Sequence, residues 1–243
     1  MKLEFVPIEL LPEIQAGINL PQRLLNAIGE CGIELQSHDI VAVTQKIISK
    51  AEGRVIHLCS VEASPQSVAI ARRTQKDPRL VEVILRESRR IVRIRGDVII
   101  CETHHGFICA NAGVDQSNIE GADAVSLLPK DPDRSAHQLA QVLGCGVIVT
   151  DTFGRVWREG LVDTAIGIAR VPPFMDFRGE RDTSGHLLQA TVLAAADSLA
   201  AAAGLVMGKT SRIPVVLIRG FQWEETESRT TMLLRAPQKD LFL

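Results

Sequence analysis

Residues 146–151 read GVIVTD, an apolar run that ends in a carboxylate. A short continuous apolar run bounded by polar residues is typical of a strand that is buried on both faces. We therefore expect a strand over residues 146–150 inside a sheet, with Asp151 released at its carboxyl end. Two further apolar runs, residues 39–43 and 214–219, predict two more buried strands.

The remaining segments mix strand and helix patterns. Alternation over residues 2–8 predicts a strand, whereas the helical spacing of apolar residues over 21–31 predicts a helix. The other expected elements are helices over 64–74, 78–89 and 187–207, strands over 93–101 and 107–110 around a turn at His104, His105 and Gly106, and a polar, basic strand end or loop over 44–53. This order lacks the regular strand–helix alternation of a Rossmann sheet. The predicted fold is therefore α+β, with a mixed sheet in a compact unit of one or two lobes, and we take residues 1–243 as a single functional unit.

Composition excludes several classes of partner. The chain has 243 residues, with 27 Lys and Arg against 29 Asp and Glu, for a formal net charge of -2. A dedicated nucleic-acid-binding domain is usually strongly basic, so this balance argues against a nucleic-acid partner. Aromatic residues make up 4% of the chain and tyrosine is absent, so stacking surfaces for single-stranded nucleic acid are scarce.

Nothing in the sequence predicts secretion or a membrane partner. The N-terminal residues MKLEFVPIELLPEIQ carry acidic side chains where a secretory signal is basic. The longest weakly polar run, residues 194–207, is interrupted by Asp197 and is too short to span a bilayer. The five cysteines are odd in number and dispersed, as expected of reduced thiols. These features predict a cytoplasmic protein.

The segment TDTFGR, residues 150–155, is the first candidate site. A carboxylate at the end of a buried strand is well placed to hold a divalent cation, and the Thr152 hydroxyl could add an oxygen ligand. Arg155 and Arg158 could bind phosphate or carboxylate through their guanidinium groups. The alternative is that Asp151 caps a turn and both arginines are solvated.

Two other polar segments are candidates for ligand binding. Residues 111–118, NAGVDQSN, suit a tight loop that presents oxygens and backbone groups to a ligand. Such loops also satisfy their own backbone through Asx turns. Residues 44–54 hold two lysines and an arginine near hydroxyl and amide groups, as in an anion-binding cradle. The alternative for this segment is a solvated edge strand protected by its lysines.

A P-loop is excluded. Gly208, Lys209 and Thr210 resemble the end of that motif, but the glycine required five positions earlier is Ala203. The segment also follows a predicted helix and precedes a predicted strand, which is the reverse of the order that a P-loop requires.

Zinc and a basic patch that attracts an anionic substrate are also disfavoured. Cys101, His104, His105 and Cys109 match no standard zinc spacing, and pairing across a hairpin explains them equally well. The basic residues between 72 and 95 are interspersed with acidic ones, so a solvated helix face is expected there.

The longer motifs, taken together, resemble the coenzyme F420-0:L-glutamate ligase family, whose members use GTP to add glutamate to a deazaflavin cofactor. The resemblance extends from residue 9 to residue 220. It rests on ELLPEI at 9–14, TQKIISKAEGR at 44–54, ETHHGFICANAGVDQSN at 102–118, LLPKDPDRSA at 127–136, VTDTFGRVWREGLVDTAIGIA at 149–169, RGERDTSG at 178–185, AADSLAAAAGLVMG at 195–208 and PVVLIRG at 214–220.

The resemblance implies metal ligands and nucleotide contacts. Asp115 and Asp151 correspond to carboxylates on a divalent ion, Mg²⁺ or Mn²⁺, and Thr152 to a ligand of a second ion. Lys50, Asp115 and Asp151 are the expected catalytic residues, and the resemblance leaves room for a monovalent cation. The positions that correspond to GTP contacts are Leu11, Pro12, Glu13, Ile14, Gln45, Lys46, Lys50, Asn118, Met207, Gly208, Lys209, Thr210, Ser211, Arg212 and Ile213.

The implied reaction joins the carboxylate of the deazaflavin F420-0 to the amine of L-glutamate and releases GDP and phosphate, through an acyl phosphate. GTP, L-glutamate and F420-0 are the expected partners, and a homodimer is the expected assembly. Moving a phosphoryl group onto a carboxylate brings like charges together. Metal ions at Asp115 and Asp151, with Lys50 nearby, would offset that repulsion.

Two positions depart from the family pattern. Lys209 stands where an acidic residue often follows Gly208, so either Thr152, water and phosphate alone hold the second ion, or Lys209 supplies positive charge in its place. His186 stands where arginine is expected after Gly185. Two alternatives stay open: an amide ligase of the same fold that acts on another small carboxylate, and a nucleotide- or cofactor-binding homologue without catalysis.

Overall fold

A five-stranded mixed sheet forms the centre of the protein. The computed structural model describes residues 2–9, 13–117 and 123–242. The strand order is β1-β12-β2-β8-β9; the β2–β8 pair is parallel and the other three pairs are antiparallel. The strands are β1 (Glu4–Ile8), β12 (Val215–Arg219), β2 (Ile40–Thr44), β8 (Gly146–Arg155) and β9 (Arg158–Ala169). The predicted α+β fold with a mixed sheet is thereby confirmed.

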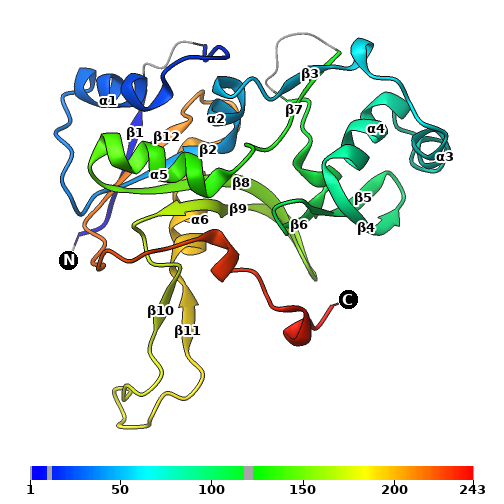
Figure 1. Cartoon of the computed structure of the whole chain (residues 1–243). Coiled ribbons are helices and arrows are strands. Elements are labelled where there is room, and N and C mark those ends of the chain that lie inside the picture. Colours follow the sequence, from blue (N-terminus) through cyan, green and yellow to red (C-terminus); the bar gives the residue numbers. More distant parts are fainter. Residues whose placement is uncertain (1, 10–12, 118–122, 243) are drawn as a thin grey trace.

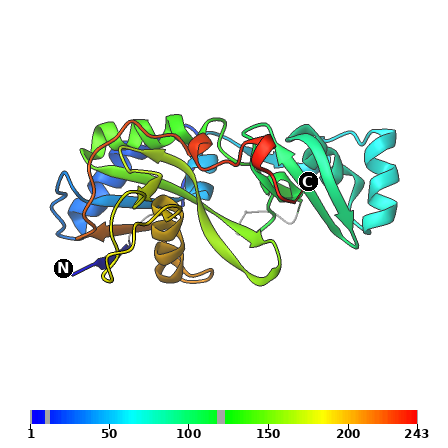
Figure 2. The same ribbon diagram turned by 90° about the horizontal axis from the view of Figure 1, so that it is seen from below.

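Helices cover both faces of this sheet (Figures 1 and 2). They are α1 (Leu20–Glu30), α5 (Pro132–Leu143) and α6 (Ala195–Met207). Because successive strand residues point to opposite faces, Val147 and Val149 pack on the side of α1 and α5, whereas Ile148 packs on the side of α6. The run GVIVT is apolar because both of its faces are covered.

A smaller lobe projects from one end of the sheet (Figure 2). It has its own apolar core, which includes Val81, Ile84, Ile99 and Cys101. The chain enters this lobe through β3 and leaves it through β7, and these two strands pair with each other. The elements are β3 (Val55–His57), α3 (Pro65–Thr74), α4 (Pro78–Arg86), β4 (Ser88–Arg95), β5 (Val98–Thr103), β6 (Ile108–Ala110) and β7 (Ala124–Ser126).

Two peripheral segments complete the structure. The strands β10 (Phe174–Asp176) and β11 (Val192–Ala194) pair in an arm that projects from the body (Figure 1). After β12, residues 220–242 run toward the smaller lobe (Figure 2), anchored where the Asp133 carboxylate of α5 accepts the Thr230 hydroxyl at 2.9 Å. No helix in the described ranges is long and apolar enough to cross a membrane.

The segment 44–53 is a helix, α2 (Gln45–Ala51), and the predicted strand end or loop is wrong. Thr44 has an extended backbone with φ −65° and ψ 138°, and the helix begins directly after it. Ile47 and Ile48 are buried in the main core. Two apolar residues are too few to produce a helical period, so basic residues dominate the sequence pattern. The alternative of an edge strand protected by lysines is wrong for the same reason.

Two helix boundaries also differ from the prediction. α6 begins at Ala195 and not at residue 187, because residues 192–194 pair with β10. α4 ends at Arg86, because residues 88–95 pair with β5 as strand β4. The single strand predicted over 93–101 is wrong: β4 ends at Arg95 and β5 begins at Val98, with a turn at Gly96, whose φ is 59°. The strands predicted near 2–8, 39–43, 107–110 and 214–219 and the helices near 21–31 and 64–74 are confirmed.

Candidate active site at the β8–β9 hairpin

The sequence predicted that Asp151 lies at the end of a strand. In the structure it lies inside a β-hairpin, so that prediction is wrong. β8 continues past it to Arg155 because these residues pair with β9. Asp151 is opposite Thr164, and Thr152 is opposite Asp163. Thr152 and Asp163 therefore point to one face of the hairpin and Asp151 points to the other. The alternative in which Asp151 caps a turn is wrong.

On the Asp151 side, Asp115 is held by Lys46 of α2. Lys46 Nζ donates to Asp115 Oδ2 at 2.7 Å and to two oxygens of Ser117 at 2.8 Å. The Ser117 amide donates to Asp115 Oδ1 at 2.8 Å, which is an Asx turn, and its hydroxyl donates to Oδ2 at 2.6 Å. Partial burial acts to raise the pKa of Asp115, but these hydrogen bonds outweigh it and the pKa is lowered. The loop thus satisfies its own backbone and also fixes a carboxylate.

The carboxyl group of Asp151 has a pKa raised to about 7. Burial is the main cause; the carboxylates of Asp115 and Asp163 add repulsion, while a backbone hydrogen bond and the Lys46 ammonium act in the opposite direction. Burial, with a contribution from the Asp151 charge, also raises the pKa of Cys109 to about 12, so β6 lies near this carboxyl group. Asp151 is thus a carboxylate near two others, an arrangement that a bound cation would favour.

On the other face of the hairpin, Lys209 binds Thr152 and Asp163. Its Nζ lies 2.6 Å from Thr152 Oγ1 and 3.0 Å from Asp163 Oδ1, and the Thr152 hydroxyl also donates to the buried Asp163 carboxylate. Lys209 directly follows Gly208, which ends α6 with a φ of 59°. Gly204 of α6 permits this packing, because a Cβ there would lie 2.2 Å from Asp163 Oδ2.

Asp163 is a site residue that the sequence analysis missed. It is the acidic member of the otherwise mostly apolar run LVDTAIGIA at residues 161–169, and it is buried. Acidic side chains are almost never fully buried unless they are paired, so an acid in such a run could have drawn attention to it. Its partner depends on the packing of α6 against the hairpin, which no local pattern reveals.

The nucleotide positions implied by the resemblance come from separate segments. Lys50 of α2 forms an ion pair with Glu13. Gln45 is buried, and its Oε1 accepts the Ser49 hydroxyl at 2.8 Å, while Ile14 belongs to the main core. Leu11, Pro12 and Asn118 lie outside the described residues.

Residues 207–213 link α6 to β12. Met207 is buried, and its carbonyl oxygen accepts the Ser211 hydroxyl. The loop after Met207 is exposed at Gly208, Lys209, Thr210, Ser211 and Arg212. Ile213 is half-buried. The loop therefore brings Lys209 to the hairpin and leaves its neighbours accessible.

The donors on the Asp151 face fit a divalent ion. Among the described residues, no group of three or more His, Cys, Asp or Glu side chains is placed to hold a metal. Mg²⁺, however, is usually held by one or two carboxylates, with water and substrate phosphates as the remaining ligands. Asp115 and Asp151 supply such oxygens, and a cation there would relieve the repulsion that raises the pKa of Asp151.

The cysteine–histidine pattern is accounted for by a hairpin. Cys101 of β5 and Cys109 of β6 lie opposite each other in the strand register, and both are buried free thiols. His104 Nε2 and His105 Nε2 lie 2.9 Å and 3.0 Å from backbone carbonyl oxygens. Both observations agree with the structural explanation of this pattern.

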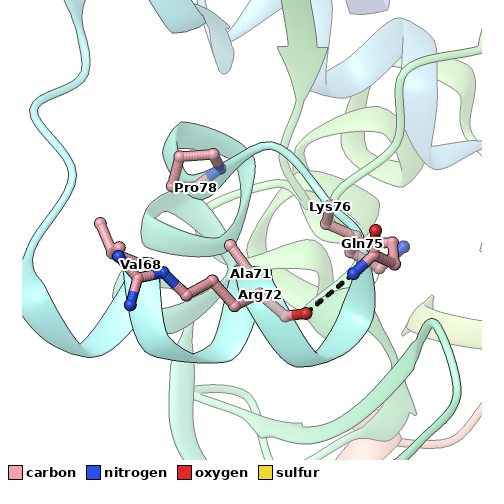
Figure 3. A pocket seen from close by; sticks show the side chains of 6 residues that line it. All are labelled: Val68, Ala71, Arg72, Gln75, Lys76 and Pro78. Carbon is pink, nitrogen blue, oxygen red and sulfur yellow. Dashed lines mark hydrogen bonds between the residues drawn. The ribbon is translucent and has the colours of Figure 1, made fainter.

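A hollow of about 480 Å³ beside α3 and α4 lies away from these residues (Figure 3). It is lined by Val68, Ala71, Arg72, Gln75, Lys76 and Pro78. Arg72 and Lys76 come from the basic stretch for which the sequence predicted a solvated helix face, and none of the six is a predicted site residue. Their one drawn hydrogen bond runs from Gln75 Nε2 to the Arg72 carbonyl oxygen at 2.9 Å.

Comparison with known proteins places the whole site in one family. A family model described as F420-0:Gamma-glutamyl ligase matches residues 9–220. A protein of Methanothermobacter thermautotrophicus named Coenzyme F420:L-glutamate ligase is 43% identical, over 100% of this chain and 99% of the relative. Proteins of the same name from Methanopyrus kandleri and Methanocaldococcus jannaschii are 42% and 37% identical, over 100% and 99% of this chain and 97% of each relative. Both faces of the hairpin lie inside the matched range.

Proposed function

The chain belongs to the F420-0:gamma-glutamyl ligase family and is a ligase that forms C–N bonds, and on this basis we propose that it joins L-glutamate to the carboxylate of F420-0 with GTP as co-substrate. The observation that carries this proposal is the placement of Asp115 and Asp151 near Lys46. Two carboxylates suited to a divalent cation, next to an ammonium group, form the electrostatic setting that phosphoryl transfer to a carboxylate needs.

In the proposed reaction, the carboxylate of F420-0 attacks the γ-phosphorus of GTP, so that an acyl phosphate forms and GDP leaves. The amine of L-glutamate then attacks the acyl carbon; the amide bond forms, phosphate leaves, and the nitrogen gives up a proton. A bound Mg²⁺ or Mn²⁺ would neutralise phosphate charge, and Asp115 and Asp151 would hold it. Lys46 fixes the Asp115 carboxylate. Lys50, which forms an ion pair with Glu13, would add a positive charge for the nucleotide.

Lys209 bears on the choice between a second metal ion and a protein charge. Its ammonium group already lies at Thr152 Oγ1 and Asp163 Oδ1. This position supports a positive charge from the protein itself in place of a second divalent ion at Thr152.

The test is a reconstituted reaction with the purified full chain, F420-0, L-glutamate, GTP and Mg²⁺ or Mn²⁺. We expect mass spectrometry to show a glutamylated deazaflavin, with GDP and phosphate released in equal amounts, and no product after chelation of the metal. Parallel reactions with ATP, and with other small carboxylates in place of F420-0, test the alternative amide ligase. Failure to form glutamylated deazaflavin with any nucleoside triphosphate would overturn the proposal. Sedimentation of the same sample tests the expected homodimer.

A further inference from the structure

The tip of the β8–β9 hairpin carries an exposed tryptophan. Arg155 pairs with Arg158, so Val156 and Trp157 form a two-residue loop. Trp157 is 84% exposed and has a φ of 62°, a conformation for which glycine or asparagine is usual in a tight turn. A bulky side chain in this conformation is strained and gains little burial, so the fold alone does not explain it.

A second aromatic side chain, from the C-terminal segment, lies against the first. Phe242 is 49% exposed, and its ring centroid is 6.3 Å from that of Trp157 with an interplanar angle of 53°. A tilted contact of this kind leaves most of the indole surface open. The chain has 7 Phe and 2 Trp in 243 residues, so two exposed aromatic rings in contact are a marked concentration.

Groups of different chemistry follow one another along the hairpin, from the Asp151 carboxyl group to the arginines and the aromatic ring at the tip. Asp151 lies in the candidate metal site, and Trp157 lies six residues further along, roughly 20 Å away for a strand. Arg155 and Arg158 are exposed beside the tip, and Arg155 donates to backbone carbonyl oxygens. In the part of the chain that the structure describes, neither arginine forms an ion pair with a carboxylate.

This order matches the order of groups in the proposed substrate, which has a reacting carboxylate, a phosphodiester and a planar heteroaromatic ring. We propose that Trp157 and Phe242 form the binding surface for the planar ring, with Arg155 and Arg158 at the phosphodiester. The inference rests on the proposed function and adds the position of the substrate. Aromatic side chains bind flat heterocycles by stacking, and guanidinium groups bind phosphate through paired hydrogen bonds.

The experiment is a titration of the intrinsic fluorescence of F420-0 with the full chain. We expect Trp157→Ala to raise the Kd for F420-0 by about tenfold or more, as the loss of a stacking side chain does elsewhere. Trp157→Phe should retain most of the affinity. The Kd for GTP should stay unchanged in both variants. Trp157→Gly relieves the strain of a positive φ, so its thermal midpoint should be at least that of the wild type while ring binding is lost. If Trp157 had a purely structural role, Trp157→Gly would lower the thermal midpoint as well as the affinity for F420-0.

Two controls separate the ring from the rest of the substrate. Leu205→Ala removes another apolar side chain that is 87% exposed, on α6, and should bind F420-0 as the wild type does. A fragment with the phosphate and carboxylate but no ring should bind equally to wild type and Trp157→Ala, and more weakly to Arg158→Ala.

The outcomes are distinguishable. Equal affinity of Trp157→Ala and wild type for F420-0 overturns the inference and leaves the proposed function intact. So does a Trp157→Ala variant that changes sedimentation but not ring affinity, because the surface then belongs to a contact between copies. A wild type that binds no F420-0 overturns the proposed function itself.

Discussion

The ammonium group of Lys209 forms an ion pair with the buried carboxylate of Asp163, with 3.0 Å between Nζ and Oδ1. The pair joins the end of α6 to β9 and places a positive charge on the hairpin face opposite Asp151. Asp163 is buried whereas most of Lys209 is exposed, so the carboxylate depends on the lysine more than the lysine depends on it.

Replacing Lys209 with glutamine should lower the free energy of unfolding by roughly 1–2 kcal/mol, because a buried carboxylate loses its charged partner while the lysine was largely solvated. Urea denaturation measures the change. In a double-mutant cycle with Asp163→Asn, the second substitution should restore most of the loss. Strictly additive effects of the two substitutions would show that the pair is not coupled.

Gly204→Ala should destabilise the protein by about 1–3 kcal/mol and lower ligase activity, because the new Cβ would lie 2.2 Å from Asp163 Oδ2 and displace that side chain. Thermal unfolding and turnover are the measurements. Gly29→Ala, in α1, is the matched control: its Cβ meets no atom within 4 Å, so that variant should be neutral or more stable. Similar losses in both variants would contradict the packing argument.

Asp151→Asn should abolish glutamate ligation and leave the fold intact. The carboxylate is a proposed metal ligand, and its removal also takes a repelled charge out of a partly buried position. The thermal midpoint of the metal-free variant should therefore equal or exceed that of the wild type, while Mn²⁺ affinity, measured by calorimetry, falls. Retained turnover would remove Asp151 from the site.

The stability of the metal-free protein should depend on pH through Asp151. Its pKa is about 7 in the folded protein and near the ordinary value of about 3.9 in the unfolded chain. Between these values the folded state binds more protons, so this group makes the free energy of unfolding fall as pH rises from about 4 to 7. Urea denaturation with a chelator, at about pH 5.5 and about pH 7.5, measures the slope.

The Asp151→Asn variant should flatten that slope. Added Mg²⁺ should stabilise the wild type more at the higher pH, because the cation binds the ionised carboxylate. Identical pH profiles for wild type and variant would rule out Asp151 as the titrating group.

Local sequence patterns predict β1, β2, β6, β8 and β12 and the four helices α1, α3, α4 and α6, but they give no signal for β9 or α5. The run GVIVT identifies a strand covered on both faces because burial there requires continuous apolar residues. They fail for α2, where only Ile47 and Ile48 mark the buried side, and for the start of α6, where residues 192–194 pair with β10. Strand pairing with a distant partner overrides helix propensity there.

Within the candidate site, sequence identified Asp115, Asp151 and Lys46 as candidates, and the structure added their proximity. It did not identify Asp163, whose pairing with Lys209 spans 46 residues. Lys209 reaches Asp163 because α6 packs back against the sheet. Local periodicity in the sequence does not show which distant segments will pack together.

The sequence by itself determined the α+β class and the family, because long motifs and buried apolar runs are written directly in the order of residues. Only the tertiary structure decided that Asp151 lies within a hairpin, that Thr152 faces Lys209 rather than Asp115, and that Trp157 meets Phe242. Each of these depends on strand register or on contacts between distant segments. A shift of one residue in register would move every side chain of the hairpin to the opposite face.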